Sequence, residues 1–243
     1  MRYNRVLVKL SGGAIAGEKQ WGFEPNSLNH ISDEILQLHK KGIQVAVVVG
    51  GGNIFKGELG ETWGIERAEA DTIGMVATVI NALMLRGVFK ARIQEEVRVM
   101  TAIPMESVAE PYIRLRAIRH LEHGSIIILA AGTGNPYVTT DYPAVQRALE
   151  LRVDALLFAK NGTDGIYTAD PRKDSASQRY RTITYDTFIR QKLQVLDQSS
   201  VILARDYTLP IHLFGFETLG AMSRICNGED IGTLICKDAD ELT

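Results

Sequence analysis

The sequence has few cysteines, no excess of either charge and no apolar segment at its start. Its 243 residues include only two cysteines, Cys226 and Cys236, so we expect a reduced thiol pair rather than a disulfide framework or a zinc site. The 27 basic and 29 acidic side chains give a net charge of -2, which argues against a broad basic surface for nucleic acid or an anionic membrane. Any anionic ligand must therefore be small and bound locally.

Several common site motifs are also missing. The glycine-rich loops contain neither the G-x-x-x-x-G-K-[ST] pattern of P-loops nor the G-x-G-x-x-G pattern of dinucleotide sites. No Ser-His-Asp or Cys-His arrangement supports covalent hydrolase chemistry. By inspection, no apolar stretch approaches the roughly 20 residues that span a bilayer. We therefore expect a cytoplasmic protein with no membrane association and no nucleic-acid partner.

What the chain does contain is a regular alternation of strand-like and helix-like segments. Apolar runs too continuous for a half-exposed strand predict a sheet covered on both faces, with strands at 5–10, 44–49, 97–102, 125–131, 155–159 and 211–214. Amphipathic helices are predicted between them, at about 28–38, 65–91, 111–123 and 143–151. The alternation predicts an α/β fold with a mainly parallel sheet, in which residues 1–243 form one domain or two lobes of one fold. The polar block 172–184 is predicted to be a mobile flap.

The predicted helix around residues 71–89 is apolar on more than one face. Such a helix is buried on several sides. Two interpretations stay open at this point: deep burial within one subunit, or burial in an interface between subunits. Self-association through this helix is therefore a hypothesis.

Glycine-rich loops follow four of the predicted strands: Lys9-Leu10-Ser11-Gly12-Gly13, Gly50-Gly51-Gly52-Asn53, Gly132 to Asp141, and Asn161 to Gly165. Each loop alone is typical of a plain turn, but glycine weakens local structure unless close backbone approach or a positive φ requires it. Because the carboxyl ends of parallel strands lie at one edge of a sheet, the four loops are predicted to meet there and form a ligand site. Backbone N–H groups beside Lys9 suit a phosphate group.

Two of these loops offer phosphate subsites that would bring two nucleotides face to face. One is Gly50 to Gly52. The other is Thr139-Thr140-Asp141, just before a helix predicted to begin at Pro143, since helix N-termini with nearby hydroxyls bind phosphate. Phosphoryl transfer between two nucleotides needs alignment, charge neutralisation and a metal ion that bridges phosphate oxygens. Lys9 can supply charge, and Lys56 either supplies a second charge or is a solvated surface residue.

Other polar residues have a structural explanation as well as a functional one. Asp71, near the start of an apolar helix, suits either the helix dipole or a pair of ribose hydroxyls. The segment Tyr167 to Pro171 suits either a β-turn or a purine with its ribose, and Asp197 suffices as an N-cap. His120 and His123 have a spacing compatible with a metal, but their place near a helix end favours stabilisation of that helix.

Five segments of the chain, in their order and at their separations, resemble one known family: VLVKLSGG, VVVGGGNIFKG, AGTGNPYVTTD, AKNGTDGIYTADP and LARDYTLPI. The family is that of the bacterial uridylate kinases, in the amino-acid kinase superfamily, and the resemblance spans residues 5–235. GTGNPYVTTD is the most specific piece, because related carboxylate kinases have a different loop there. The resemblance implies a three-layer α/β/α sandwich, a homohexamer, and Mg²⁺-dependent transfer of the γ-phosphoryl group of ATP to UMP in pyrimidine nucleotide biosynthesis.

The resemblance also implies roles for individual residues. ATP is assigned to Lys9, Leu10, Ser11, Gly12, Gly52, Lys56, Asn161, Tyr167 and Asp170. UMP is assigned to Gly51, Asp71, Thr133, Gly134, Asn135, Pro136, Tyr137, Val138, Thr139 and Thr140. Lys9 would stabilise the transferring phosphoryl group and Asp197 would orient Lys9, while Mg²⁺ would arrive with the nucleotide rather than at a separate metal site.

Regulation by GTP as activator and UTP as inhibitor is common in the resembled family, and residues 17–22 fall where its activation-associated loop lies. This chain departs from the family pattern at Lys56, where arginine is usual, at Gly13, where glutamate is usual, and in the unusual Glu18-Lys19-Gln20-Trp21. Since arginine binds phosphate as a fork and lysine as a point charge, these departures bear on phosphate geometry and effector response. Two rival functions stay open: a carboxylate kinase of the same superfamily and a non-catalytic nucleotide sensor.

Overall fold

Alternation along strand β1 (Arg5–Leu10) sets the layers of the fold. Successive side chains of a strand point to opposite faces, and here Val6, Val8 and Leu10 pack in one buried apolar cluster while Leu7 packs in another. Both faces must therefore be covered by helices. The first cluster draws on α1 (Gly12–Ala16), α2 (Pro25–Lys40), α4 (Arg67–Lys90) and α9 (Ala221–Asn227). The second draws on α5 (Arg114–Glu122), α6 (Asp141–Glu150), α7 (Tyr185–Arg190) and α8 (Gln198–Asp206).

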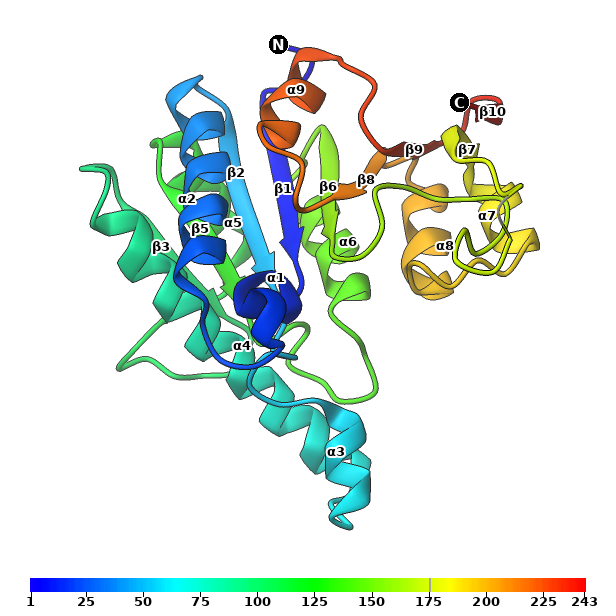
Figure 1. Cartoon of the computed structure of the whole chain (residues 1–243). Helices are drawn as coiled ribbons and strands as arrows, with labels where there is room; N and C mark the ends of the chain where they lie inside the picture. The colour runs from blue at the N-terminus through cyan, green and yellow to red at the C-terminus, as the bar shows by residue number, and fades with distance from the viewer. Residues whose placement is uncertain (175) are drawn as a thin grey trace.

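One sheet of ten strands lies between these two helical layers, within residues 1–174 and 176–243, which this computed structural model describes (Figure 1). The spatial order is β10 (Glu241–Leu242), β7 (Tyr180–Thr184), β9 (Thr233–Cys236), β8 (Ile211–Gly215), β6 (Ala155–Lys160), β1, β2 (Gln44–Val49), β5 (Ile126–Ala130), β3 (Val97–Thr101) and β4 (Glu110–Pro111). Neighbours from β8 to β4 are parallel, whereas β9 runs antiparallel to β8. The predicted three-layer fold around a mainly parallel sheet is confirmed.

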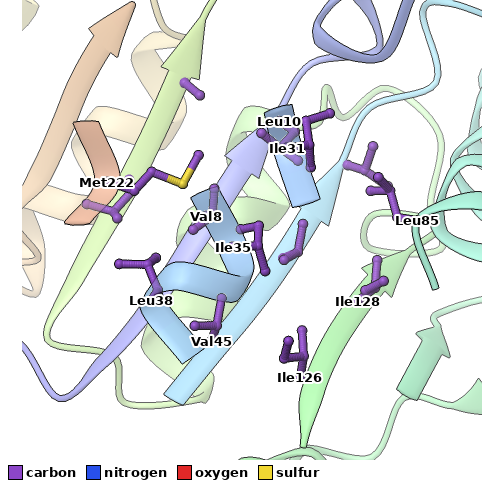
Figure 2. Packing of buried hydrophobic residues seen from close by; sticks show 14 of the residues in the cluster. Val8, Leu10, Ile31, Ile35, Leu38, Val45, Leu85, Ile126, Ile128 and Met222 are labelled. Atoms are coloured by element: carbon purple, nitrogen blue, oxygen red, sulfur yellow. The ribbon is translucent and has the colours of Figure 1, made fainter. Parts of the chain in front are cut away.

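Helix α2 illustrates how one layer is fixed on the sheet. It begins after Glu24, whose carboxylate accepts a hydrogen bond from the backbone amide three residues later at 2.6 Å, and it stops before Gly42, which has a φ of 81°. Between these ends Ile31, Ile35 and Leu38 point onto β1 and β2, as Figure 2 shows. Each such buried side chain contributes about 1.5–3 kcal/mol through the hydrophobic effect. The predicted amphipathic helix is confirmed.

Strand β1 lies at the centre of the parallel region, between β2 and β6. From β1 the chain proceeds to β2, β3 and β5 on one side and then to β6 and β8 on the other, so the strand order reverses at β1. Ligands of open α/β sheets bind at the carboxyl ends of strands beside such a reversal. The four glycine-rich loops follow β6, β1, β2 and β5, which are consecutive neighbours in the sheet. The expectation that these loops share one edge is therefore confirmed.

Three segments differ from the sequence prediction. The block 172–184, predicted to be a mobile flap, ends in β7, which pairs with β9 and β10; Ser175, inside this block, lies outside the described residues. Pro111, predicted to start a helix, lies in β4, because that short segment pairs with β3 and α5 begins only after it. The helix predicted to begin at Pro143 begins at Asp141, which places a carboxylate in its first turn.

Helix α4 has two different faces. By length and composition it is apolar enough to cross a membrane, with a mean hydropathy of 1.6 over its most apolar 18 residues, 39% of them buried, so the expectation that no stretch approaches this length was wrong. The polar Asn81 and the charged Arg86 interrupt the stretch, so it does not form one continuous apolar run in the sequence. Val79, Leu85 and Phe89 pack in the first cluster. The exposed apolar side chains of α4 are Ile73, Val76, Ile80 and Met84.

The remaining short elements lie beside the edge that carries the glycine-rich loops. A single 3₁₀ turn, Gly17–Lys19, follows α1, and α3 (Gly57–Thr62) follows the β2 loop. Helix α3 packs against α4 and extends away from the sheet (Figure 1). The loop from β1 and the loop from β2 thus each lead directly into helices that border the same edge.

Candidate active site

Lys9 is the penultimate residue of β1 and lies on the face that α6 covers. Leu7 and Lys9 share that face because side chains alternate along a strand, and α6 begins with Asp141. The distance from Lys9 Nζ to Asp141 Oδ1 is 2.6 Å, and the two residues are only 5% and 8% exposed. The ammonium also lies 5.1 Å from the ring centre of Phe158 in β6. A buried ion pair therefore stands at the carboxyl edge of the sheet.

Lys160 brings a second ammonium group to the same place. It ends β6, the neighbour of β1, and shares a face with Leu156 and Phe158, which pack in the second cluster. Burial is the main cause that lowers the pKa of Lys160; Asp141 partly opposes this shift and Lys9 adds to it. Lys9 and Lys160 point to the same face of adjacent strands, so both ammonium groups lie near the Asp141 carboxylate.

Asp141 remains ionised between these lysines. Burial alone would raise the pKa of its carboxyl, but Lys9, Lys160 and the backbone amide of Asp197 together outweigh burial, and the pKa lies below its ordinary value. An ammonium group has three N–H donors, so the ion pair with Asp141 leaves donors on Lys9. The carboxylate thus fixes Lys9 directly, while the Lys160 ammonium lies near enough to feel its charge.

Asp197 reaches the same cluster from α8. It is the N-cap residue of α8, but its side chain makes no capping hydrogen bond; it accepts one from the hydroxyl of Thr139 instead. Its backbone amide also favours the ionised form of Asp141. The carboxylate that pairs with Lys9 in this structure is Asp141, and the role of Asp197 in orienting Lys9 stays a prediction. Asp197 ties α8 to the loop that precedes α6.

The loops after β1 and β2 form one wall of the site because glycine lets them approach. A Cβ on Gly12 would lie 2.6 Å from the backbone nitrogens of both Gly52 and Asn53, so no larger residue fits without movement of the backbone. A Cβ on Gly52 would have no atom within 4 Å, and the Gly52 backbone therefore borders open space. The hydroxyl of Ser11 caps α1 by accepting a hydrogen bond from the Ala14 amide at 3.1 Å.

Three adjoining cavities run along this edge of the sheet. The α4 cavity, of about 380 Å³, lies between α4, the β2 loop and the loop before α6. The central cavity, of about 510 Å³, is lined by Lys9, Ser11 and Gly12, and the β6 cavity, of about 640 Å³, is lined by residues that follow β6. The α4 and central cavities share Gly51, Gly52, Lys56 and Thr140. Asn161 lines both the central cavity and the β6 cavity, so the three form one continuous groove.

Asp71 borders the α4 cavity. Its carboxylate accepts hydrogen bonds from the Tyr137 amide at 2.7 Å and from Arg67 Nε at 2.9 Å, so it ties α4 to the loop before α6. Tyr137 has a φ of 66°, in the left-handed region that a bulky residue rarely adopts. The backbone of Tyr137 is therefore strained, and its amide is the group that donates to Asp71. A carboxylate held in this way suits a pair of ribose hydroxyls.

Tyr167 and Asp170 line the β6 cavity. The Tyr167 hydroxyl donates to Asp164 at 2.7 Å, and this bond is the main cause that raises the pKa of Tyr167. Asp170 pairs with Arg172 at 3.1 Å, and hydrogen bonds from Arg172 lower the pKa of Asp170. An aromatic residue and an acid thus border the same cavity, as a purine with its ribose requires.

Comparison with known proteins agrees with this geometry. Residues 4–215 match the profile of the amino acid kinase family. The uridylate kinase of Frankia alni is 54% identical over 234 residues, which are 96% of this chain and 91% of that protein. The uridylate kinase of Limosilactobacillus reuteri is 44% identical over 235 residues, which are 97% of this chain and 98% of that protein. The chain belongs to the amino acid kinase family.

Solved structures agree with the membership in this family. The UMP kinase from Bacillus anthracis is 53% identical to this amino acid kinase and superimposes on it with a TM-score of 0.98 over 100% of both chains. The UMP kinase from Ureaplasma parvum is 29% identical, with a TM-score of 0.91 over 98% of this chain and 100% of the other.

Most of the residues assigned from the sequence lie along the groove of this amino acid kinase. The α4 or central cavity is lined by Lys9, Ser11, Gly12, Gly51, Gly52, Lys56, Asp71, Asn135, Val138, Thr139 and Thr140. The β6 cavity is lined by Asn161, Tyr167 and Asp170. Thr133, Gly134, Pro136 and Tyr137 belong to the loop before α6 but line none of the three cavities. Leu10 is 0% exposed and lines none of the three cavities. The contacts of all these residues with ATP and UMP stay predictions.

Asp141 and Lys160 are the groups that the sequence analysis did not assign. Both lie inside the quoted motifs, and a signal for each was present. Lys160 ends a buried strand, and its side chain lies on the same face of the sheet as that of Lys9. Asp141 ends the loop that was expected to hold phosphate, but the helix was predicted to begin later, at Pro143.

His120 and His123, whose spacing is compatible with a metal, line none of the three cavities of the groove. His120 Nε2 meets Glu110 Oε2 at 3.0 Å, and His123 Nδ1 meets the carbonyl oxygen of Arg119 at 2.7 Å. Both residues lie at the C-terminal end of α5, where a cation interacts favourably with the helix dipole. The geometry favours the helix-stabilising interpretation over a metal site.

We expect Asp141→Asn to lower the free energy of unfolding at pH 6 by about 3–5 kcal/mol, because it leaves buried ammonium groups without their counter-ion. The folded-state pKa of Asp141 lies below the unfolded value. The stabilisation from its ionised form is therefore complete above the unfolded pKa, about 4, and is lost as the pH falls through the folded-state pKa.

Urea denaturation of both proteins at pH 6 and pH 3 measures this effect, and the difference between them should shrink in acid. Asp33→Asn, which removes an exposed pair with Arg92, is the matched control and should cost about 1 kcal/mol or less. A difference that stays constant with pH would contradict the ion-pair account.

Proposed function

We propose that this amino acid kinase transfers the γ-phosphoryl group of ATP to UMP, giving ADP and UDP, with residues 1–243 acting as one domain in pyrimidine nucleotide biosynthesis. The observation that carries the proposal is the continuous groove with Lys9 at its centre. Asp71 lines one end of the groove, and Tyr167 and Asp170 line the other. The two ends therefore differ in chemistry, as separate acceptor and donor nucleotides would require. The uridylate kinase relatives support the identity of the acceptor.

UMP is assigned to the α4 cavity and ATP to the β6 cavity. Asp71, already an acceptor for the Tyr137 amide, is available to the ribose hydroxyls of UMP. Tyr167 and Asp170 border the space for the adenine nucleotide. Both phosphate chains then extend into the central cavity, where Gly52 borders open space. This arrangement aligns the acceptor phosphate with the γ-phosphate, which is most of what phosphoryl transfer asks of a protein.

The chemical step needs charge stabilisation rather than covalent catalysis. An oxygen of the UMP phosphate attacks the γ-phosphorus, a new P–O bond forms, and the bond from that phosphorus to the β–γ bridging oxygen breaks with its electrons going to ADP. Lys9 and Lys160 donate to the oxygens on which negative charge accumulates. Asp141 keeps the Lys9 ammonium in place in the free enzyme, so little reorganisation of this group is needed during the reaction.

A magnesium ion carried by ATP fits this site. Mg²⁺ prefers oxygen ligands and is held mainly by substrate phosphates, water and one or two carboxylates. Asp141 and Asp197 are the carboxylates at the central cluster, and these two residues would hold it. The ion would supply additional neutralisation of the phosphate oxygens.

Self-association into a homohexamer is part of the proposal, supported by the exposed apolar face of α4. Ile73, Val76, Ile80 and Met84 are each more than one third exposed. An apolar groove of about 640 Å³ is lined by Ile80, Leu83, Met84, Gly87, Val88 and Ala91. A surface of this kind on a water-soluble enzyme is typical of a subunit interface.

Regulation and location complete the proposal. GTP is proposed as an activator and UTP as an inhibitor because this regulation is common in the resembled family, although residues 18–21 depart from its pattern in the activation-associated loop; rate assays with either nucleotide added test this. The cytoplasm, where ATP and UMP are both present, is the proposed location. The free thiols of Cys226 and Cys236 are compatible with a reducing compartment.

Lys9→Ala should lower kcat about 10²- to 10³-fold, because the missing ammonium acts mainly in the transition state. Since it also leaves the buried Asp141 carboxylate without its ion-pair partner, circular dichroism verifies that the variant is folded. A coupled assay of ADP release with ATP and UMP measures this, with Lys40→Ala on the exposed end of α2 as the control. Aspartate and glutamate as acceptors test the rival carboxylate kinase. Full turnover by Lys9→Ala would exclude the catalytic role, and absent turnover in the wild type would favour a nucleotide sensor.

Asp71→Asn should raise KM for UMP about tenfold or more and leave KM for ATP nearly unchanged, because a charged acceptor to ribose hydroxyls is lost. Steady-state kinetics with each substrate varied in turn measures the split. Glu69→Gln, an exposed neighbour in the first turn of α4, is the matched control. Equal increases for both nucleotides would place Asp71 elsewhere in the site.

Ile80→Glu should dissociate the assembly, because it places a charge in the apolar groove of α4. Light scattering at micromolar concentration measures the mass. Leu219→Glu, at a side chain that is 77% exposed and distant in sequence from α4, should leave the mass unchanged. A wild-type protein that scatters as a monomer would refute the proposed assembly.

A further inference from the structure

Two loops meet beside the central cavity through one buried asparagine. The backbone amide of Gly22 donates to the carbonyl oxygen of Asn53 at 2.8 Å, and the side-chain amide of Asn53 donates to the carbonyl oxygen of Gly22 at 2.8 Å. The loop that contains Trp21 is therefore bound to the β2 loop at a single residue pair. Lys56 follows Asn53 by three positions.

Asn53 is itself held rigidly. It is 1% exposed and exchanges two hydrogen bonds with Asn81 of α4, at 2.6 Å and 3.1 Å. Asn81, which is 0% exposed, also donates to the carbonyl oxygen of Gly50 at 2.7 Å. Since buried amides with all partners satisfied rigidify their surroundings, the two loops are fixed relative to each other and to α4.

The hydrogen bonds of Asn53 hold the two loops so that Trp21 contacts Lys56. Lys56 Nζ lies 5.2 Å from the centre of the Trp21 ring, within the range of a cation–π interaction. Trp21 is 44% exposed, so it does not complete the core, and folding alone does not explain a tryptophan there. Lys56 lines both the α4 cavity and the central cavity, so its ammonium stands at their junction.

A lysine needs such support more than an arginine does. Its ammonium is a point charge at the end of four rotatable bonds, whereas the planar guanidinium of arginine is organised in advance to bind phosphate as a fork. Restricting the rotamers of Lys56 before phosphate binds reduces the entropy lost on binding. The two loops that meet here both depart from the resembled family, one at Lys56 and the other in the segment that contains Trp21.

We propose that Trp21 is a positioning residue that holds the Lys56 ammonium at the junction of the acceptor and donor ends of the groove. It acts through Lys56 and needs no contact with the substrate. The proposal rests on the proposed kinase reaction for its kinetic consequence, but its structural part requires only that a nucleotide phosphate binds near Lys56.

A double-mutant cycle tests the kinetic part. Trp21→Leu, which removes the aromatic face but keeps an apolar side chain, should lower kcat/KM for ATP about 2- to 5-fold, the size expected of an exposed cation–π contact. Trp21→Phe should lose less, since phenylalanine also offers a π face. In a Lys56→Met background, Trp21→Leu should have no further effect. An equal loss in both backgrounds would overturn the proposal, as would wild-type kcat/KM in Trp21→Leu.

Fluorescence tests the structural part without turnover. Trp21 and Trp63 are the two tryptophans of the chain, and Trp63 is 67% exposed at the end of α3 and lines none of the three cavities. In a Trp63→Phe protein, Mg²⁺–ATP or UMP should change the emission of Trp21, and Lys56→Met should abolish that change. An emission change that persists in Lys56→Met, with nucleotide binding verified by calorimetry, would overturn the positioning role. Because this readout needs only binding, it separates failure of the positioning role from failure of the kinase reaction.

Discussion

The ion pair between Lys9 and Asp141 is the interaction on which the site depends. A lysine at the end of a buried central strand is unfavourable unless a carboxylate meets it, and the first residue of α6 supplies that carboxylate at 2.6 Å. Lys160 is drawn into the same cluster from the neighbouring strand. The fold thus brings two ammonium groups close to one carboxylate at the edge of the groove. Asp141, the carboxylate that makes the burial of Lys9 tolerable, is also the group that orients its ammonium.

Strand order then determines what lies on either side of this pair. Because β1 is the strand at which the order reverses, the loops after β2 and β5 lie on one side of Lys9 and the loop after β6 lies on the other. Two ligand spaces of different chemistry therefore adjoin one charge cluster. Asp71 connects α4 to the loop before α6, and the amide pair of Asn53 and Asn81 connects α4 to the β2 loop. Helix α4 thus supports one end of the groove with one face, while its other face exposes apolar side chains.

The sequence was sufficient for the parallel core and for the edge at which the site lies. Strands with uninterrupted branched residues, such as β1 and β2, were predicted to the residue, since burial on both faces leaves one dominant pattern. The short segments β4 and β7 were missed because pairing with distant strands, rather than local propensity, makes them strands. The contact of Asp141 with Lys9 was missed for a related reason: it depends on which face of β1 is covered by α6, and on a helix start earlier than Pro143 indicated. Motifs placed the loops at one edge, but only three-dimensional packing showed which carboxylate meets which lysine.

One groove is proposed to hold donor and acceptor together, with their phosphates meeting at Lys9. A single molecule in which uridine and adenosine are joined through a chain of phosphates would then occupy both ends at once. It should bind with a stoichiometry of one per subunit and compete with both UMP and ATP. Competition with only one of the two nucleotides, or binding of two molecules per subunit, would contradict the proposed arrangement.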